Sequence, residues 1–556
     1  MTSPEASATT MRATAEGMDV LSPQHDFRAH SALLALAGWC VWRPVETFPA
    51  TAVVVAASIL GLSVWAWRRT PRRASPWLIA GSMGAAVAAA AMLGWDPASA
   101  ILEIALAAAM LAVVWLSSRS SPPENWPTLL ALVISALALW GLWQVAGGME
   151  RMAASLGDLP QEFQLSAAER LASGRAFASQ MLPSHLAVLF ATALPLLLVR
   201  SRLRWSAAPW VLGSLLCVIG LALTRSPVGA ALALAACGAL ALRRRHRLLV
   251  WIALILIVIL AIVVIGRGDV MELKPVKLRV DNWRTALWVW SQTPAAGVGI
   301  GGFAQAAQAV PFDVGNRPRH AHSLPLELLA ELGPMGLLVS ALMIVGLWRL
   351  ARDLWAERPE LSLALTVIPA HNLVDFSLYS SGVALVWGVL LGWGLSLRNR
   401  TRELPIRSAK GRVVFVSTAA LAVAATILHV TSIAVEESAI VQTDSRERFG
   451  GAIRARHLAP WRVDPLGVVA NAALETGEPR LITEALGELQ GGRWLRPRSA
   501  AMAGLRARLA TAVGEAPTAV TEAWTAAAEQ PSNEMHADAF EDLLDHLELR
   551  TDDDAS

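Results

Sequence analysis

Long runs of uncharged apolar residues recur from residue 31 to residue 433, and they constrain the fold of this 556-residue chain more than any other feature. A helix that spans a membrane needs roughly 20 mostly apolar residues. Apolar residues make up 54% of the chain and charged residues only 16%, whereas soluble domains carry about 25% charged residues. The sequence therefore predicts one large membrane domain and disfavours an ordinary soluble enzyme.

Thirteen segments satisfy the length and composition rule for a spanning helix, although the first is short. They are residues 29–44, 48–67, 76–95, 99–117, 126–146, 182–199, 206–223, 227–242, 248–266, 324–348, 361–377, 382–397 and 413–433. The residues before them are polar and lack the short apolar core and cleavage site of a secretory signal. We therefore predict a polar tail over residues 1–28 and an all-α polytopic bundle of about 12–13 spans over residues 29–433.

Clusters of arginine and lysine between the spans predict the orientation of the bundle, because basic residues close to span ends stay on the cytoplasmic side. With a cytoplasmic N-terminus and thirteen crossings, every cluster falls on that side. The clusters occupy residues 68–73, 200–204, 243–247, 349–358 and 398–412. The long connections 147–181 and 267–323, and the whole segment from residue 434, then lie on the outer side.

Residues 434–556 differ in character from the rest of the chain, because charge rises and Ala-rich stretches with Leu at helical spacing alternate with Pro and Gly. These stretches are residues 446–458, 464–476, 480–490, 497–513 and 516–529. They predict a soluble array of helical hairpins that resembles tetratricopeptide repeats. Two interpretations stay open: a docking surface for a partner outside the membrane, or a solvated helical appendage.

The cysteines and the net charge argue against several kinds of partner. Cys40, Cys217 and Cys237 all lie inside apolar runs, where a thiol behaves as a small hydrophobic group. Neither a disulfide framework nor a cysteine metal site is therefore predicted. The net charge is only +3, and the basic residues form short clusters instead of one continuous face, which disfavours nucleic acid as a partner.

The outer loop 267–323 carries seven lysine and arginine residues, against the rule that sets the orientation. Guanidinium groups bind phosphate oxygens through two parallel hydrogen bonds and keep their charge. A cationic lining beside the bilayer would therefore suit an anionic lipid headgroup or a lipid pyrophosphate. Ordinary solvated loop charges are the competing interpretation.

Two arginine-containing motifs lie at the outer membrane boundary. Arg225 is in the motif Leu-Thr-Arg-Ser-Pro-Val-Gly between two apolar spans, where an ionisable residue is a functional candidate and snorkelling is the alternative. The other motif begins at Arg279, continues with Trp283 and Arg284, and ends in the Gly-rich stretch 294–303. Glycines allow a close approach to a ligand, but any re-entrant loop would also use them.

His320 and His322 directly precede the span that begins near residue 324. Histidine exchanges a proton near neutral pH, which makes it a natural general base for activating a hydroxyl. For His320, a solvated or supporting role competes with catalysis. Two histidines at i and i+2 do not share a helix face, and no carboxylate or cysteine follows at a zinc-like spacing, so metal binding is disfavoured.

Four further ionisable residues lie in or next to the late predicted spans. His371 and Asp375 are spaced i, i+4 on one predicted helix face, and a structural pair that satisfies two polar groups is the favoured interpretation. Glu327 and Glu331 share this spacing at the start of the span at 324–348. Either residue orients a histidine or faces a wet vestibule.

The order of these motifs resembles the O-antigen ligase and polymerase superfamily over roughly residues 30–435. Ligases of that superfamily carry a His followed by Asn, Ser or Gln, then nine residues and Gly-x-x-Gly, and this pattern matches His322-Ser323 and Gly333-Pro-Met-Gly336. The segment Leu165 to Leu186, with Ser173-Gly174-Arg175 and Phe177, resembles a second family stretch, and His371-Asn-Leu-Val-Asp375-Phe376 resembles a third.

The chain also departs from the family pattern. Ser323 stands where Asn is commonest, and the family's Asn-Pro-Asn after the Ser-Gly motif is absent, with Gln180, Met181 and Pro183 nearby instead. Roles that the family gives to those asparagines therefore do not transfer to this chain.

The resemblance implies a metal-independent glycosyltransferase without a cofactor, in the inner membrane of a bacterium. It would take a glycan from undecaprenyl pyrophosphate on the periplasmic side and attach it to an acceptor hydroxyl on lipid A-core. It implies His322 as the general base and Arg225 and Arg279 as pyrophosphate ligands, with Arg175 and Arg284 as weaker candidates. His320, Glu331, His371 and Asp375 are secondary candidates.

Other functions remain open at this point. A polymerase of O-antigen or exopolysaccharide and a protein O-oligosaccharyltransferase use the same chemistry on another acceptor. A secondary transporter belongs to a different class, since many spans with a few intramembrane charges also describe transporters. Against a transporter, the sequence shows no inverted repeat, and its ionisable residues cluster on one face of the membrane instead of the midplane.

Overall fold

The structure is a computed structural model of the whole chain, and it describes most of the chain after residue 125. The described ranges are residues 125–154, 170–180, 182–200, 208–244, 274–312, 318–398, 431–495, 498–530 and 534–546, with scattered single positions elsewhere. The predicted tail and six predicted spans lie wholly or mostly outside them. Those segments are residues 1–28, 29–44, 48–67, 76–95, 99–117, 248–266 and 413–433.

The described part of the membrane domain is built from helices at the predicted apolar runs. They are α6 (Trp126–Trp143), the π-helix η1 (Gln144–Gly148), α7 (Met149–Ala154), α9 (Pro183–Leu198), α10 (Ala208–Thr224), α11 (Pro227–Arg244), α16 (Pro334–Trp355), α17 (Pro359–His371) and α18 (Ser381–Arg398). The only described strands are the two-residue segments β1 (Arg73–Ala74) and β2 (Leu404–Pro405), which pair antiparallel. The prediction of a helical fold is confirmed for the described residues.

Three helical stretches of the described chain are long and apolar enough to cross a membrane: Trp126–Ala154, Pro334–Trp355 and Ser381–Arg398. Three shorter helices are also apolar, namely Pro183–Leu198, Ala208–Thr224 and Pro227–Arg243. The length and apolar composition of these helices are typical of an integral membrane protein. The total of about 12–13 spans and the orientation stay predictions.

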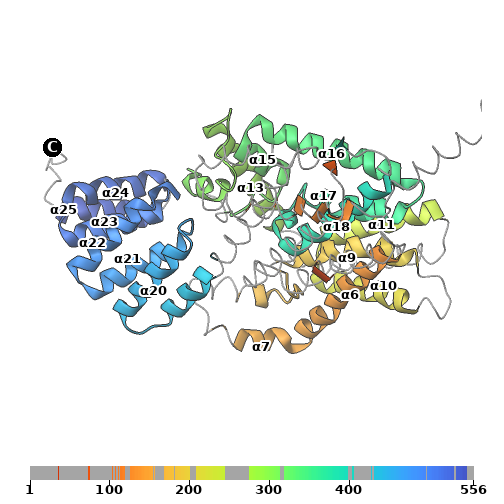
Figure 1. Cartoon of the computed structure of the whole chain (residues 1–556), viewed down its shortest axis with the longest axis horizontal. Helices are drawn as coiled ribbons and strands as arrows, with labels where there is room; N and C mark the ends of the chain where they lie inside the picture. Colours follow the sequence, from red (N-terminus) through yellow and green to blue (C-terminus); the bar gives the residue numbers. More distant parts are fainter. Residues whose placement is uncertain are drawn as a thin grey trace, which may run out of the picture.

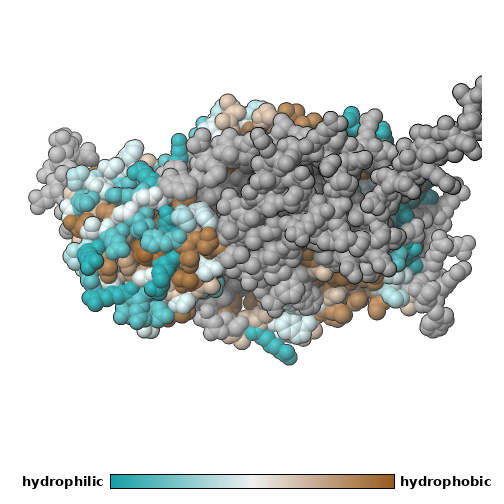
Figure 2. All heavy atoms as spheres, in the orientation of Figure 1, coloured by the Kyte–Doolittle hydropathy of each residue, from teal (hydrophilic) through white to brown (hydrophobic). Residues whose placement is uncertain are grey.

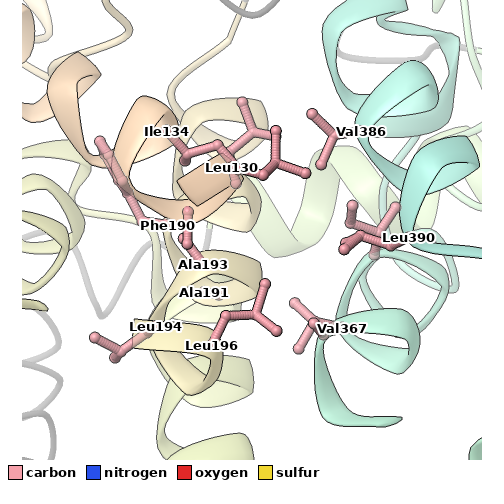
Figure 3. Close-up of a cluster of buried hydrophobic side chains, with 14 of the residues drawn as sticks. Leu130, Ile134, Phe190, Ala191, Ala193, Leu194, Leu196, Val367, Val386 and Leu390 are labelled. Atoms are coloured by element: carbon pink, nitrogen blue, oxygen red, sulfur yellow. The ribbon is translucent and has the colours of Figure 1, made fainter. Parts of the chain in front are cut away.

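The helix α9 lies at the centre of the apolar core. Its side chains are buried from Pro183 to Leu198 with the exception of Ser184, and it packs against α6, α10, α11 and α17. Figure 3 shows Phe190 and Leu194 of α9 on the same side of this cluster as Leu130 and Ile134 of α6, with Val386 of α18 on the opposite side. Such complete burial fits a helix that touches other helices on all sides.

The helix α16 contrasts with α9, because most of its apolar side chains are exposed. These residues are Met335, Leu337, Leu338, Val339, Leu342, Met343, Ile344, Val345 and Trp348. An uncharged apolar face of this kind suits contact with lipid chains, which are as apolar as leucine. We infer that α16 lies at the edge of the bundle.

The span predicted at 324–348 is wrong as a single helix. The structure has α15 (Leu324–Leu332) and then α16, with Gly333 between them at φ 61° and ψ −149°. A Cβ on Gly333 would lie 2.7 Å from the carbonyl oxygen of Ala295, so the break belongs to a close backbone contact with the outer loop.

The span predicted at 361–377 is also wrong at its end, because α17 ends at His371. Asp375 lies in the turn that follows, before the short helix η6 (Ser377–Tyr379). His371 and Asp375 therefore do not share a helix face. The side chain of Asn372 stabilises the turn by accepting a hydrogen bond from Leu378 N at 3.0 Å and donating one to Ser377 Oγ at 2.9 Å.

The outer loop contains helices of its own. They are α13 (Lys274–Gln292), α14 (Phe303–Ala306) and η5 (Ala307–Ala309), and α13 packs on α15. The Gly-rich stretch crosses the end of α15, where Val298 N and Gly299 N donate to Ala330 O and Glu331 O at 3.0 and 2.9 Å. Because glycine has no Cβ, Gly297 can approach the backbone of Glu331, which a Cβ would meet at 2.3 Å.

The C-terminal segment forms an array of helices at one end of the molecule (Figure 1). They are α20 (Ser445–Leu458), α21 (Asp464–Thr476), α22 (Pro479–Gly491), η7 (Arg493–Leu495), α23 (Ala500–Val513), α24 (Ala516–Glu529) and α25 (Glu534–His546). Neighbouring helices pack in sequence order, and hydrophilic and hydrophobic residues mix on the visible surface (Figure 2). The predicted helices are confirmed, whereas the likeness to tetratricopeptide repeats stays a prediction.

One hydrogen bond joins this array to the outer loop. The amide nitrogen Nε2 of Gln305, in α14, donates to the backbone carbonyl of Arg498 at 2.7 Å. Gln305 is buried. The array therefore contacts the same loop that carries Arg279 and the two histidines.

Candidate active site

Asp375 is the centre of a cluster of ionisable side chains, and its carboxylate is only 1% exposed. Oxygen Oδ1 lies 3.7 Å from His185 Nε2 and 3.9 Å from His322 Nδ1. Oxygen Oδ2 lies 3.5 Å from Arg279 Nη2 and 3.7 Å from His371 Nε2. The structure thus brings four residues from distant parts of the chain around one negative charge.

Different elements position these side chains. His185 is in the first turn of α9, Arg279 is on α13, and His371 ends α17. Arg279 Nε also donates to Val374 O at 3.1 Å, so its guanidinium is attached to the turn beside Asp375. The loop helix α13 and the membrane helices α9 and α17 therefore meet at this turn.

The ring of Phe376 contacts three histidines in and beside the cluster. The rings of His185 and His322 stand edge-on to it, with centroids 5.0 and 4.7 Å away. His320 instead stacks on it at 4.3 Å, with an interplanar angle of 21°. Three histidines thus share one aromatic neighbour, which fixes their rings close to Asp375.

The backbone of His322 has a left-handed conformation, with φ 53°. Among the described residues other than glycine, only Ala178 and Arg225 also have positive φ, at 48° and 47°. Trp283 Nε1 donates to the His322 carbonyl at 3.2 Å and supports this conformation. Strained backbone concentrates at functional sites, and two of these three residues, His322 and Arg225, are predicted site residues.

Burial lowers the pKa of His322 to about 4. The negative charge of Asp375 opposes this shift, and the positive charge of Arg279 adds to it. The imidazole of His322 is therefore neutral at neutral pH and has a nitrogen that can accept a proton.

His320 and Glu327 form a separate contact next to this cluster. His320 Nδ1 lies 2.8 Å from Glu327 Oε1, and the backbone N–H of Ala321 donates to Oε2 at 2.9 Å. Of the two interpretations for Glu327, orientation of a histidine is therefore the one that the structure favours. Glu331 differs, because its carboxylate accepts from the backbone N–H of Phe303 and holds the Gly-rich stretch.

Arg225 and Arg175 lie together at a second position of the outer face. Arg175 Nε donates to Thr224 O at 2.9 Å, and Ala176 N donates to Leu223 O at 3.0 Å. The Ser-Gly-Arg motif therefore runs along the end of α10, directly beside Arg225, whose side chain is exposed.

Two glutamines connect this position to the rest of the site. The buried side chain of Gln144 accepts from Phe177 N and Ala178 N at 3.1 and 2.7 Å, and donates to Ala178 O at 3.1 Å. Gln180 Oε1 accepts from Ser380 Oγ at 3.4 Å, in the connection that follows Asp375. The 173–180 segment therefore bridges Arg225 and the histidine cluster.

Arg284 is placed differently from the other predicted arginines. Its side chain is exposed, and its guanidinium lies over the ring of Phe312, 4.1 Å from the centroid. It is five residues from Arg279 on α13, which puts the two side chains on different helix faces. No contact between Arg284 and Asp375 occurs among the described residues.

His185 was missed by sequence reasoning, and so were the roles of Phe376 and Gln144. A histidine at the outer end of an uncharged apolar span is the signal that identifies His185 as a candidate. Among the described residues, no group of three or more His, Cys, Asp or Glu has an arrangement that could hold a metal ion.

Residues 210–341 match a family model described as O-Antigen ligase. The chain carries an O-antigen ligase domain. No curated protein and no solved structure matches it.

This match over residues 210–341 supports the O-antigen ligase superfamily and, at the level of the family, an O-antigen ligase-like glycan-transfer function in a membrane. Such a function suggests a glycosyltransferase-like enzyme with a lipid-linked glycan and an acceptor as substrates. The matched O-antigen ligase domain contains Arg225, Arg279 and His322. His185 and Asp375 lie outside it; Asp375 was a candidate from the sequence, whereas His185 is identified only by the structure.

Proposed function

We propose that this O-antigen ligase domain transfers a glycan from undecaprenyl pyrophosphate to an acceptor hydroxyl on the periplasmic side of a bacterial inner membrane. One observation carries the proposal: His322 and Arg279, from separate parts of the outer loop, both lie beside the buried carboxylate of Asp375. A base and a fixed cation side by side are what transfer from a pyrophosphate donor requires.

In this proposal His322 removes the proton of the acceptor hydroxyl. Its Nδ1 faces Asp375, so Nε2 is the nitrogen left for the substrate. The acceptor oxygen bonds to the anomeric carbon, the bond from that carbon to the diphosphate breaks, and the electron pair stays on the diphosphate. Asp375 stabilises the imidazolium that His322 becomes, as the carboxylate of a catalytic triad does.

Arginines stabilise the negative charge that develops on the leaving diphosphate. Arg279 is 24% exposed and uses one edge of its guanidinium for Asp375 and Val374, which leaves other N–H groups for phosphate oxygens. Arg225 is exposed at the neighbouring position and acts as the second ligand, with Arg175 beside it. Arg284 is a weaker candidate because it packs on Phe312.

The acceptor distinguishes the members of this superfamily. Lipid A-core as acceptor defines a ligase, a growing glycan defines a polymerase, and a protein hydroxyl defines an O-oligosaccharyltransferase. We propose the ligase reaction first. A secondary transporter is the alternative from another class, and it would move its substrate across the membrane without forming a covalent product.

The test begins with cells that lack the gene, whose accumulated lipid-linked glycan is extracted and identified. The purified protein in liposomes then receives this extracted donor with membranes from the same cells, and both the glycan product and free undecaprenyl pyrophosphate are measured. We expect His322→Ala to abolish transfer and His457→Ala, on an exposed histidine of the C-terminal array, to leave it unchanged. Transfer by His322→Ala at the normal rate, or no covalent product with the unaltered protein, sinks the proposal.

A further inference from the structure

His320 is held more firmly than His322, although the family motif contains only the latter. Its ring lies between two aromatic side chains, stacked on Phe376 at 4.3 Å and tilted against Tyr379 at 4.6 Å. Its Nδ1 is 2.8 Å from Glu327 Oε1. Because three neighbours fix the ring of His320, its other nitrogen, Nε2, points in one direction.

Glu327 determines which nitrogen of His320 carries the proton. The carboxylate is 1% exposed and also binds the N–H of Ala321 and the hydroxyl of Tyr379. An ionised carboxylate only accepts hydrogen bonds, so Nδ1 of His320 donates to it. Nε2 is then the free acceptor, and because 24% of the side chain is exposed, a proton can enter or leave.

The two histidines differ in how closely each contacts a carboxylate. A proton on His320 stays next to the Glu327 carboxylate, whose oxygen is within hydrogen-bond distance. A proton on His322 lies 3.9 Å from Asp375 and is opposed by burial and by Arg279. His320 is therefore in direct hydrogen-bond contact with a carboxylate, whereas His322 is not.

We propose that His320 and Glu327 form a proton-accepting dyad and that His320 takes up the proton lost by the acceptor hydroxyl. The inference rests on the proposed function. The acceptor oxygen bonds to the anomeric carbon, and the diphosphate leaves with the electron pair of the broken bond. The proton moves to His322, then through a bridging water or hydroxyl to Nε2 of His320, and from there to solvent after the product leaves.

The other ionisable groups around the dyad do not replace it. Tyr379 contacts the ring of His320 from the turn before α18, and the ring of His322 contacts Phe376, as that of His320 does. Glu331 and Glu103 lie near Glu327 and Tyr379 and add negative charge. Of these carboxylates, Glu327 is the one with a described contact to an imidazole of the dyad.

Glu327→Gln tests the dyad because glutamine keeps the size and an acceptor oxygen but has no charge. We expect the transfer rate to fall about 100-fold, the magnitude typical of general base catalysis. The acidic limb of the pH profile should also move about one unit lower, because an imidazolium without its carboxylate is less stable. A purely structural role would not move this limb.

His320→Ala gives a second readout through chemical rescue. We expect about 100-fold slower transfer, partly restored by added imidazole, because a free base can occupy the space of the lost ring. His457→Ala is the matched control, since His457 also lies near a glutamate, Glu488 at 3.6 Å, but on the exposed surface of the C-terminal array. It should neither slow transfer nor respond to imidazole.

Two outcomes overturn the dyad: normal transfer by both variants, or slow transfer with an unchanged pH profile and no imidazole rescue. The second outcome would make the contact structural. If the unaltered protein forms product while the dyad predictions fail, only this inference is lost. If the unaltered protein forms no product, the proposed function itself fails.

Discussion

Replacement of Asp375 by asparagine tests the centre of the cluster, because it removes the charge and keeps the shape of the side chain. His322 Nδ1 lies 3.9 Å from Asp375 Oδ1. Two unit charges about 4 Å apart attract by about 4 kcal/mol at an effective dielectric constant of about 20. Partial exposure of His322 weakens this attraction, and we take about 2 kcal/mol as the lower bound.

In the proposed reaction, the charge of Asp375 acts on the imidazolium of His322, which forms only as the acceptor loses its proton. Its loss therefore raises the barrier by about 2–4 kcal/mol, which corresponds to roughly 30- to 1,000-fold slower transfer. Substrate binding should change less than the rate, because the interaction belongs to the transition state. The assay is the single-turnover rate of glycan transfer in liposomes with saturating extracted donor.

Asp353→Asn is the matched control for this substitution. Asp353 also pairs with arginines, Arg398 at 2.9 Å and Arg352 at 3.1 Å, but on the partly exposed end of α16. We expect its transfer rate to be normal. The reasoning is refuted if Asp375→Asn is as folded as this control, by melting temperature and gel filtration, and transfers at the same rate.

Three further predictions concern the arginines, pH and the helix break. Arg225→Lys and Arg279→Lys should both slow the release of undecaprenyl pyrophosphate although charge is kept, because lysine lacks the bidentate fork, and full activity of both variants would contradict the assignment. Because the pKa of His322 is lowered in the folded protein, the unfolded chain binds this proton more readily. The free energy of unfolding should therefore decrease as the pH is lowered from about 6.5 toward 4. His322→Gln should make the melting temperature drop less between about pH 7 and pH 5. Gly333→Ala should destabilise the protein by about 1–3 kcal/mol, because φ 61° is strained for alanine and its Cβ meets a backbone carbonyl, whereas Gly346→Ala has open space and should melt normally.

Apolar periodicity and helix breakers predicted most of the described helices. The stretches at 464–476 and 516–529 match α21 and α24 at both ends, because Pro and Gly flank them and their contacts are with neighbours in sequence. The helix α13 was not predicted, because its charged residues indicated a loop between two spans. It is stabilised by packing on α15, a contact that sequence spacing does not reveal.

The site was predicted in its residue types and not in its arrangement. Motif order selected His322 and Arg279, and the structure places both beside Asp375. Sequence spacing wrongly placed His371 and Asp375 on one helix face. The helix α17 ends at His371, and the side chain of Asp375 lies near His185 of α9. His185 joins the cluster only through this tertiary packing, which no local pattern encodes.

The charge balance around Asp375 has a consequence for the order of events. The carboxylate faces one guanidinium and three imidazoles, so the cluster is neutral overall while the histidines are unprotonated. Any proton taken up leaves an unbalanced positive charge in a buried place, which is unfavourable until an anion arrives. In the proposed reaction, a diphosphate bound by Arg279 would supply that anion. In the proposed reaction the donor therefore has to bind before the acceptor: an acceptor that entered first would meet a His322 that holds a proton poorly, whereas one that entered second would meet a His322 ready to take its proton.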